Sequence, residues 1–144
     1  MIDERRNQMK LKRLKLFGDQ FALSWAVCAG DVIHVAGMVG MEVDMSAPRL
    51  EKVTFPEGIE AQMRQCYKNI DYILQSVGSS LADIAEQTMF FTGDSDEATA
   101  ATNVVRREVF GDLPPASATV GVAQLFDPRC RLEMKVTAYR GAGN

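Results

Sequence analysis

One amphipathic helical pattern in the middle of the chain most constrains the fold. Between residues 59 and 77, apolar side chains recur at steps of three and four, on one face of a helix: Ile59, Met63, Cys66, Ile70, Ile73, Leu74 and Val77. We expect Pro56 in the first turn of this helix and Gly78 in the left-handed conformation that ends it. Such an apolar face must pack against a sheet or another helix.

The residues before this helix have a pattern typical of strands. Residues 20–41 hold β-branched and aromatic side chains on both sides of Gly30 and Asp31, which predicts a β-hairpin with its turn there. Residues 11–18 alternate loosely and predict an edge strand whose lysines oppose pairing with another chain. Residues 43–58 have no period and contain two prolines, so we expect a loop.

The second half of the chain predicts a strand at 85–93, a helix from Ser95 to Gly111, and strands at 117–125 and 130–139. The element order is strand-strand-(strand)-helix-strand-helix-strand-strand. This order predicts an α+β fold in which one sheet carries both helices on one face. The other face then lacks cover, and apolar side chains such as Met38, Phe90, Val120 and Val122 predict an oligomer.

The length of 144 residues fits a single domain over 1–144, in which residues 1–15 form a basic N-terminal segment or an edge strand. Basic residues in this segment could touch RNA or an anionic surface, but a solvated terminal segment explains them more simply. The formal net charge of −3 offers no broad positive field, so nucleic acid is disfavoured as a partner.

The sequence favours a cytoplasmic protein without metal or cofactor. No apolar run has the length of a membrane span, and the N-terminus begins with charges where a signal peptide needs apolar residues. Cys28, Cys66 and Cys130 are widely spaced and odd in number, which argues against both a disulfide framework and a zinc site. We expect them to be reduced, with Cys66 in the core. Phosphate-binding glycine motifs are absent from the sequence.

Five stretches together resemble the Rid family of reactive intermediate deaminases, also called the YjgF or L-PSP family. They are GDVIHVAGMVG (30–40), YKNIDYILQSVGSSLADI (67–84), QTMFFTGD (87–94), TNVVRREVFGDLPPA (102–116) and RLEMKVTAY (131–139). The resemblance covers residues 23–139 and implies a chorismate-mutase-like fold, a homotrimer and three clefts between subunits. The best known members hydrolyse imines and enamines to a keto acid and ammonia without a cofactor, and others are described as ribonucleases, translation inhibitors or chaperones.

The closing signature of the family is present with one departure. Pro115-Ala116 and the triplet 132–134 match it, but the position of the family arginine holds Ser117. In the family deaminases this arginine binds the carboxylate of a 2-imino acid through two charge-assisted hydrogen bonds, which a serine hydroxyl cannot replace. The resemblance therefore implies a divergent member with a different substrate.

The remaining cleft positions are partly retained. Leu23 stands at a frequent family tyrosine, and Ala36 stands at the serine that precedes the family glycine, here Gly37. The helix asparagine is retained as Asn103, and Thr119 stands where a backbone carbonyl often helps to activate water. The resemblance thus implies Glu133 and Thr119 as catalytic positions, and Ser117, Asn103, Gly37, Ala36 and Leu23 as substrate-binding positions. Trp25 and His34 are added as substrate-binding candidates for the chemistry of their side chains.

Several of these residues have simpler explanations. Glu133 must point away from its neighbours on the strand, so it either orients a hydrolytic water in a cleft or pairs with Arg131 in solvent. His34, the only histidine, could act as an acid or base, but packing explains a lone histidine on a strand as well. Trp25 could stack on a ligand or lie in the core. Ser117 could be a nucleophile, although its alignment implies only a small pocket wall.

An anion site could also have moved to another arginine, for which Arg129, Arg131 and Arg140 are the candidates and solvated surface positions the alternative. The leading functional hypothesis is a homotrimer that hydrolyses a small imine, enamine or related metabolite other than a simple 2-imino acid. The alternative is a noncatalytic trimer that binds a ligand or protects other proteins. A ribonuclease or RNA-binding function has only the basic N-terminal segment in its favour.

Overall fold

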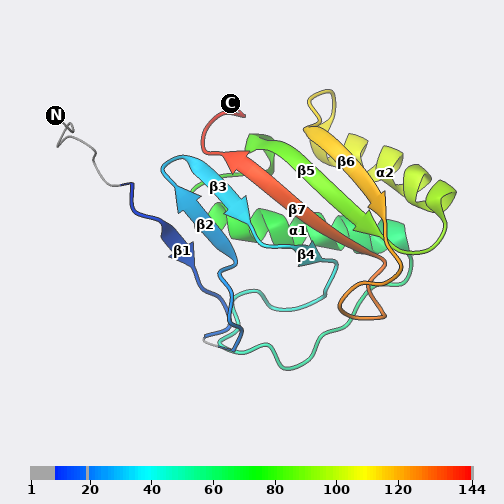
Figure 1. The fold of residues 1–144 in the computed structure, drawn as a ribbon, viewed down its shortest axis with the longest axis horizontal. Helices are drawn as coiled ribbons and strands as arrows, with labels where there is room; N and C mark the ends of the chain where they lie inside the picture. Colours follow the sequence, from blue (N-terminus) through cyan, green and yellow to red (C-terminus); the bar gives the residue numbers. More distant parts are fainter. Residues whose placement is uncertain (1–8, 19, 144) are drawn as a thin grey trace.

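A seven-stranded mixed sheet carries both long helices on one face in the computed structural model, which describes residues 9–18 and 20–143 (Figure 1). The strands are β1 (Lys12–Leu14), β2 (Ala26–Ala29), β3 (Val32–Val35), β4 (Met38–Val39), β5 (Ile84–Phe91), β6 (Ala116–Gly121) and β7 (Leu132–Tyr139). The helices are α1 (Ile59–Ser76), α2 (Ser95–Phe110) and the short 3₁₀ helix η1 (Leu81–Asp83). The predicted α+β fold is confirmed.

The strand order is β1-β2-β3-β7-β5-β6, and β4 also pairs with β7. Only β5 and β6 are parallel, and the other pairs are antiparallel. The predicted hairpin is confirmed: Ala29 pairs with Val32, and Gly30 takes a φ of 61° in the turn between them. Such a φ is easily reached only without a side chain.

A break separates β3 from β4, which the sequence pattern of residues 20–41 did not predict. His34 pairs with Thr137 and Met38 with Met134, so a step of four residues faces a step of three on β7. One residue is therefore extra on this side, as in a β-bulge. The extra residue falls between Val35 and Gly37, and Gly37 lies beside Glu133 of β7.

Both predicted helices are present, with a correction at the start of α1. Gly58 is the residue before the helix, with a φ of 87°, so Pro56 precedes the first turn instead of lying in it. Gly78 takes a φ of 76° after the last turn, as predicted. At the start of α2 the Asp94 carboxylate accepts hydrogen bonds from two backbone N–H groups, at 2.7 and 3.0 Å, which caps this helix.

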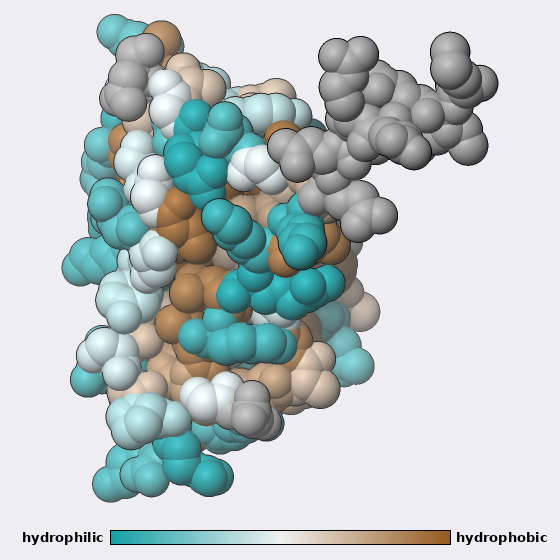
Figure 2. Space-filling model, turned by 90° about the vertical axis from the view of Figure 1, so that its left-hand side faces the viewer, coloured by the Kyte–Doolittle hydropathy of each residue, from teal (hydrophilic) through white to brown (hydrophobic). Residues whose placement is uncertain are grey.

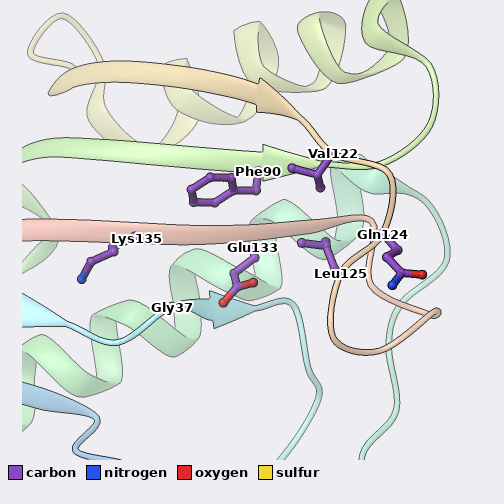
Figure 3. A pocket seen from close by; sticks show the side chains of 7 residues that line it. All are labelled: Gly37, Phe90, Val122, Gln124, Leu125, Glu133 and Lys135. Atoms are coloured by element: carbon purple, nitrogen blue, oxygen red, sulfur yellow. The ribbon is translucent and has the colours of Figure 1, made fainter.

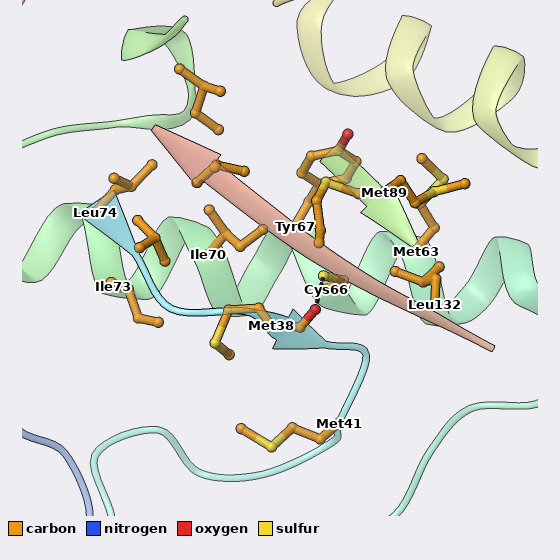
Figure 4. Packing of buried hydrophobic residues seen from close by; sticks show 14 of the residues in the cluster. Met38, Met41, Met63, Cys66, Tyr67, Ile70, Ile73, Leu74, Met89 and Leu132 are labelled. Atoms are coloured by element: carbon orange, nitrogen blue, oxygen red, sulfur yellow. Dashed lines mark hydrogen bonds between the residues drawn. The ribbon is translucent and has the colours of Figure 1, made fainter. Parts of the chain in front are cut away.

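The apolar faces of the helices pack on the sheet to form the core (Figure 4). Cys66 is fully buried, as predicted, and its thiol donates to the carbonyl of Met38 at 3.3 Å. Burial raises the pKa of this thiol. The expectation that Met38 belongs to the uncovered face is wrong, because its side chain is 1% exposed and lies on the helix side. Cys28 and Cys130 are also buried free thiols.

The opposite face of the sheet is covered by no helix in the described part of the chain (Figure 1). Phe90 and Val122 are partly exposed there, and Val120 is 41% exposed. In the following loop the Phe126 ring is fully exposed. These apolar side chains are suited to burial against another molecule.

At the β1 edge the sheet ends in charged residues. Lys12 and Arg13 are exposed on β1, as predicted for a protected edge strand, and residues 1–8 of the predicted basic segment lie outside the described residues. Figure 2 shows this side of the molecule, where hydrophilic side chains lie around and across apolar ones. No helix among residues 9–18 and 20–143 has the length and apolar character needed to cross a membrane.

Candidate functional site

A cavity of about 340 Å³ lies on the open face of the sheet, beside the break between β3 and β4 (Figure 3). Its lining consists of Gly37, Phe90, Val122, Gln124, Leu125, Glu133 and Lys135. Two of the predicted site residues, Gly37 and Glu133, therefore meet in one place. The cavity holds one carboxylate and one ammonium group in otherwise apolar or neutral surroundings.

Strand alternation places Glu133 in this cavity. Its neighbours Leu132 and Met134 are fully buried on the helix side, so Glu133 points to the open face, where it is half-buried. Gly37 leaves room for it, since a Cβ at that position would overlap the Glu133 carboxylate. The alternative ion pair with Arg131 is not formed, because the Arg131 guanidinium lies 2.9 Å from Glu97 instead.

A second cavity, of about 440 Å³, lies between α2 and β6. Its lining consists of Thr102, Asn103, Arg106, Arg107, Gly111, Asp112, Pro114, Pro115 and Ser117. Ser117 and Asn103 are thus brought together. Thr119 lies two residues farther along β6, and its hydroxyl accepts a hydrogen bond from Arg106 Nη2 at 3.4 Å.

The Ser117 hydroxyl belongs to a chain of hydrogen bonds that begins in the core. The Tyr67 hydroxyl donates to Gln87 Oε1 at 2.8 Å, and Gln87 Nε2 donates to Ser117 Oγ at 2.9 Å. Ser117 Oγ in turn donates to the carbonyl of Pro115 at 3.0 Å. Because its proton is already bonded to a carbonyl, Ser117 is not prepared as a nucleophile, and the structure supports its interpretation as a pocket wall.

The two cavities lie on opposite faces of the sheet. Ser117 is in register with Gln87, which is buried on the helix side. Glu133 is in register with Phe90, which points to the open face (Figure 3). Since successive side chains alternate between faces, Ser117 and Glu133 of one chain cannot line one cavity.

The five other predicted site residues line neither cavity, and Thr119 is one of them. Trp25 is buried, with Phe17 and Phe21 at T-shaped ring distances of 5.3 and 6.0 Å, so its rings pack in the core. Leu23 is an exposed loop residue. The Ala36 N–H donates to the carbonyl of Trp25, and His34 is exposed on β3.

The three arginines considered for a displaced anion site are already bound to carboxylates within the chain. Arg129 pairs with Asp127, Arg131 with Glu97 and Arg140 with Asp31, at 2.8 to 3.0 Å. The sequence analysis missed Arg106, which lines the second cavity together with Arg107. Its position three residues after Asn103, on the same side of the helix, was the available signal.

No group of three or more His, Cys, Asp or Glu side chains within the described ranges is placed to hold a metal ion.

Comparisons with known proteins agree with the predicted family and fold. The family model of endoribonuclease L-PSP matches residues 19–140. A 2-iminobutanoate/2-iminopropanoate deaminase of Dermatophagoides farinae is 33% identical over 102 residues, which cover 71% of this chain and 73% of that protein. A RutC family protein of Pyrococcus horikoshii is 30% identical over 118 residues, covering 81% and 86% of the two chains.

A solved structure extends the agreement to three dimensions. RidA from an Antarctic Psychrobacter species superposes with a TM-score of 0.74 at 27% identity, covering 89% of this chain and 98% of that chain. The family match spans most of the sequence and includes both cavities. The chain therefore belongs to the endoribonuclease L-PSP family, the same family as the YjgF and Rid proteins.

Proposed function

We propose that this protein is a cofactor-free hydrolase that acts on a small reactive imine or enamine in clefts between the subunits of a homotrimer. The observation that carries the proposal is the placement of the family cleft residues on two faces of one sheet. A cleft that contains both Glu133 and Ser117 needs the open face of one copy beside β6 of another. β6 lies at a sheet edge with all six residues exposed, so it is accessible to such a neighbour.

The proposed reaction adds water to the C=N carbon. The Glu133 carboxylate and the Thr119 carbonyl would hold the water as hydrogen-bond acceptors, and the proton released on attack would pass to nitrogen. The C–N bond of the tetrahedral intermediate then breaks, which gives a carbonyl compound and ammonia. Most of the rate enhancement in such a site comes from holding water and substrate in reactive geometry.

The proposed substrate differs from the simple 2-imino acids. Ser117 cannot form the two-pronged contact of an arginine with a carboxylate, and its hydroxyl is already bonded to Gln87 and Pro115. A cytoplasmic location is part of the proposal, since three buried free thiols suit a reducing compartment.

The test is the rate of ammonia release from imines generated in the assay by an amine oxidase, with 2-imino acids generated by an amino-acid oxidase as the comparison. Glu133→Gln keeps the size of the side chain but removes its charge, and we expect at least about a hundredfold loss of turnover with little change in ligand affinity. We expect Ser117→Arg to gain activity toward 2-iminopropanoate. Rapid hydrolysis of 2-iminopropanoate by the natural chain would contradict the proposed substrate.

The second candidate function is a noncatalytic trimer that binds a ligand or protects other proteins. It is favoured by the Ser117 hydroxyl, which is used in internal hydrogen bonding at the position where family deaminases bind substrate. Under this alternative, Glu133→Ala changes the affinity for a ligand and alters no turnover. Ribonuclease activity has weaker support, because the net charge is −3 and basic residues gather only near the N-terminus.

A further inference from the structure

A guanidinium without an anionic partner lies in the cavity between α2 and β6. Arg106 is half-buried, and its Nε is enclosed with no hydrogen-bond acceptor among residues 9–18 and 20–143. Its guanidinium makes a long contact of 3.4 Å with the Thr119 hydroxyl and lies near the hydroxyl of Tyr67, and neither of these partners is an anion at neutral pH. Partial removal of a cation from water is unfavourable unless an anion compensates for it.

Four other arginines of this protein form ion pairs with carboxylates and serve as a comparison for Arg106. Each has a nitrogen between 2.6 and 3.0 Å from a carboxylate oxygen: Arg64, Arg129, Arg131 and Arg140. Arg106 forms no such ion pair with a carboxylate of the described residues. An anionic partner for Arg106 would therefore come from outside this part of the chain.

The surroundings of Arg106 favour a negatively charged ligand. Arg107 lines the same cavity, and Asp112 is the one carboxylate among the lining residues. Asn103 lies one turn before Arg106 and adds amide donors on the same side of α2. Burial raises the pKa of Tyr67 to about 12, and the charge of Arg106 opposes this rise.

The small residue at position 117 fits this arrangement. A second long cationic side chain projecting from β6 would enter the same cavity as Arg106, and the two like charges would repel each other. Serine leaves that space open. Its hydroxyl bonds to Gln87 and Pro115 instead, away from the guanidinium.

We infer that Arg106 binds the carboxylate of the ligand in this cavity and is a specificity-determining residue that enters from α2 instead of β6. The inference rests on the proposed function only in taking this cavity as one wall of the ligand cleft. A carboxylate bound by Arg106, beside Thr119, would lie at a different distance from the reacting carbon than a carboxylate bound by an arginine at position 117. The ligand class is therefore a small carboxylate-bearing imine, enamine or carbonyl compound other than a 2-imino acid.

Binding of stable carbonyl compounds tests the inference without any turnover. The probes are 2-oxobutanoate and 4-oxopentanoate, which differ in the distance from carboxylate to carbonyl carbon, together with the neutral amide of each. We expect 4-oxopentanoate to bind more tightly than its amide and more tightly than 2-oxobutanoate, as measured by isothermal titration calorimetry, and the opposite order of the two carboxylates would contradict the ligand class. Arg106→Gln should weaken that binding about tenfold or more and abolish the preference over the amide, while Arg106→Lys should retain part of it.

Two further variants separate a specific contact from a general positive field. Arg49→Gln removes the same charge from an exposed loop outside both cavities, and we expect unchanged affinity. Arg107→Gln should weaken binding less than Arg106→Gln does. Equal losses in the two cavity variants would overturn the inference, because they would indicate a diffuse field.

The remaining outcomes distinguish this inference from the proposed hydrolysis. If Arg106→Gln leaves carboxylate affinity unchanged but lowers trimer stability, Arg106 pairs with a carboxylate of a neighbouring copy and the inference fails. If the natural chain does not prefer a carboxylate to its amide, it also fails. Arg106-dependent binding without turnover of any imine would support the inference and refute the hydrolase. The reverse pattern, turnover that does not depend on Arg106, would leave the hydrolase intact and refute the inference.

Discussion

The Glu133 carboxylate lies against the main chain of Gly37, so close that an added Cβ at Gly37 would overlap it. The contact joins β7 to the break between β3 and β4, where one extra residue shifts the pairing register. The direction of the carboxylate is thus set by a main-chain irregularity of the neighbouring strand. Small changes at Gly37 should therefore act on function more than on folding.

Gly37→Ala and Gly40→Ala form a matched pair for this idea. A methyl group added at position 37 would displace the flexible end of Glu133, so we expect reduced turnover with a loss of less than about 1 kcal/mol in unfolding free energy. At position 40 the Cβ would meet the main chain of Gln62, which cannot move without shifting α1. We expect Gly40→Ala to destabilise the fold by about 1–3 kcal/mol or more. Urea unfolding and the imine assay check both, and equal stability losses would contradict the distinction.

The hydrogen bonds through Gln87 predict coupling between two distant positions. Tyr67→Phe removes the donor to Gln87 Oε1, and Ser117→Ala removes the acceptor of Gln87 Nε2. Each should lower the free energy of unfolding by about 1 kcal/mol. Because both bonds fix the same amide, the double variant should differ from the sum by about 0.5 kcal/mol or more. Strict additivity in urea unfolding would show that the two bonds act independently.

The uncovered sheet face predicts how the proposed homotrimer is held together. Val120 is 41% exposed on β6 and lies in register with Phe90 on the open face. Val120→Asp should dissociate the trimer, since a buried unpaired carboxylate is unfavourable. Tyr72→Asp, at an exposed position on α1, is the control that should keep the natural mass. Light scattering after gel filtration measures the mass, and a monomeric natural chain would refute the cleft itself.

Asp83 predicts a loss of stability in acid. Burial acts to raise the pKa of its carboxyl, but hydrogen bonds from the Ser79 hydroxyl and from the N–H groups of Gly141 and Gly143 outweigh this, so the pKa is lowered. A lowered pKa in the folded state means that the carboxylate stabilises the fold above about pH 4 and loses this effect as the pH falls through the folded value.

Replacement of this carboxylate should therefore matter most near neutral pH. Asp83→Asn should lower the melting temperature at pH 7, and the difference from the natural chain should shrink as the pH falls below about 4. Thermal unfolding between pH 2 and pH 7 checks this expectation. A difference that does not change with pH would mean that the hydrogen bonds, and not the charge, stabilise the turn.

Local patterns in the sequence were sufficient for the two helices, the hairpin and the orientation of Glu133. The spacing of Ile59, Met63 and Ile70 defines an apolar helical face, whatever the helix packs against. Side chains alternate along a strand, so Glu133 points to the opposite face from Leu132 and Met134. The buried polar residues of α1 could not be predicted in this way. Gln62 and Asn69 lie on the buried face because they donate to main-chain carbonyls of segments distant in the sequence.

By itself, the sequence determined the elements, their apolar faces and the departure at Ser117. Only the tertiary structure decided that β3 and β4 share β7 with a shifted register, that Ser117 and Glu133 lie on opposite faces, and that Arg106 reaches Thr119. The physical reason is the sequence distance over which the interactions act. The periodic placement of apolar residues involves neighbours three or four residues apart. Sheet register, and the meeting of side chains from different strands, depend on segments that come together only when the whole core packs.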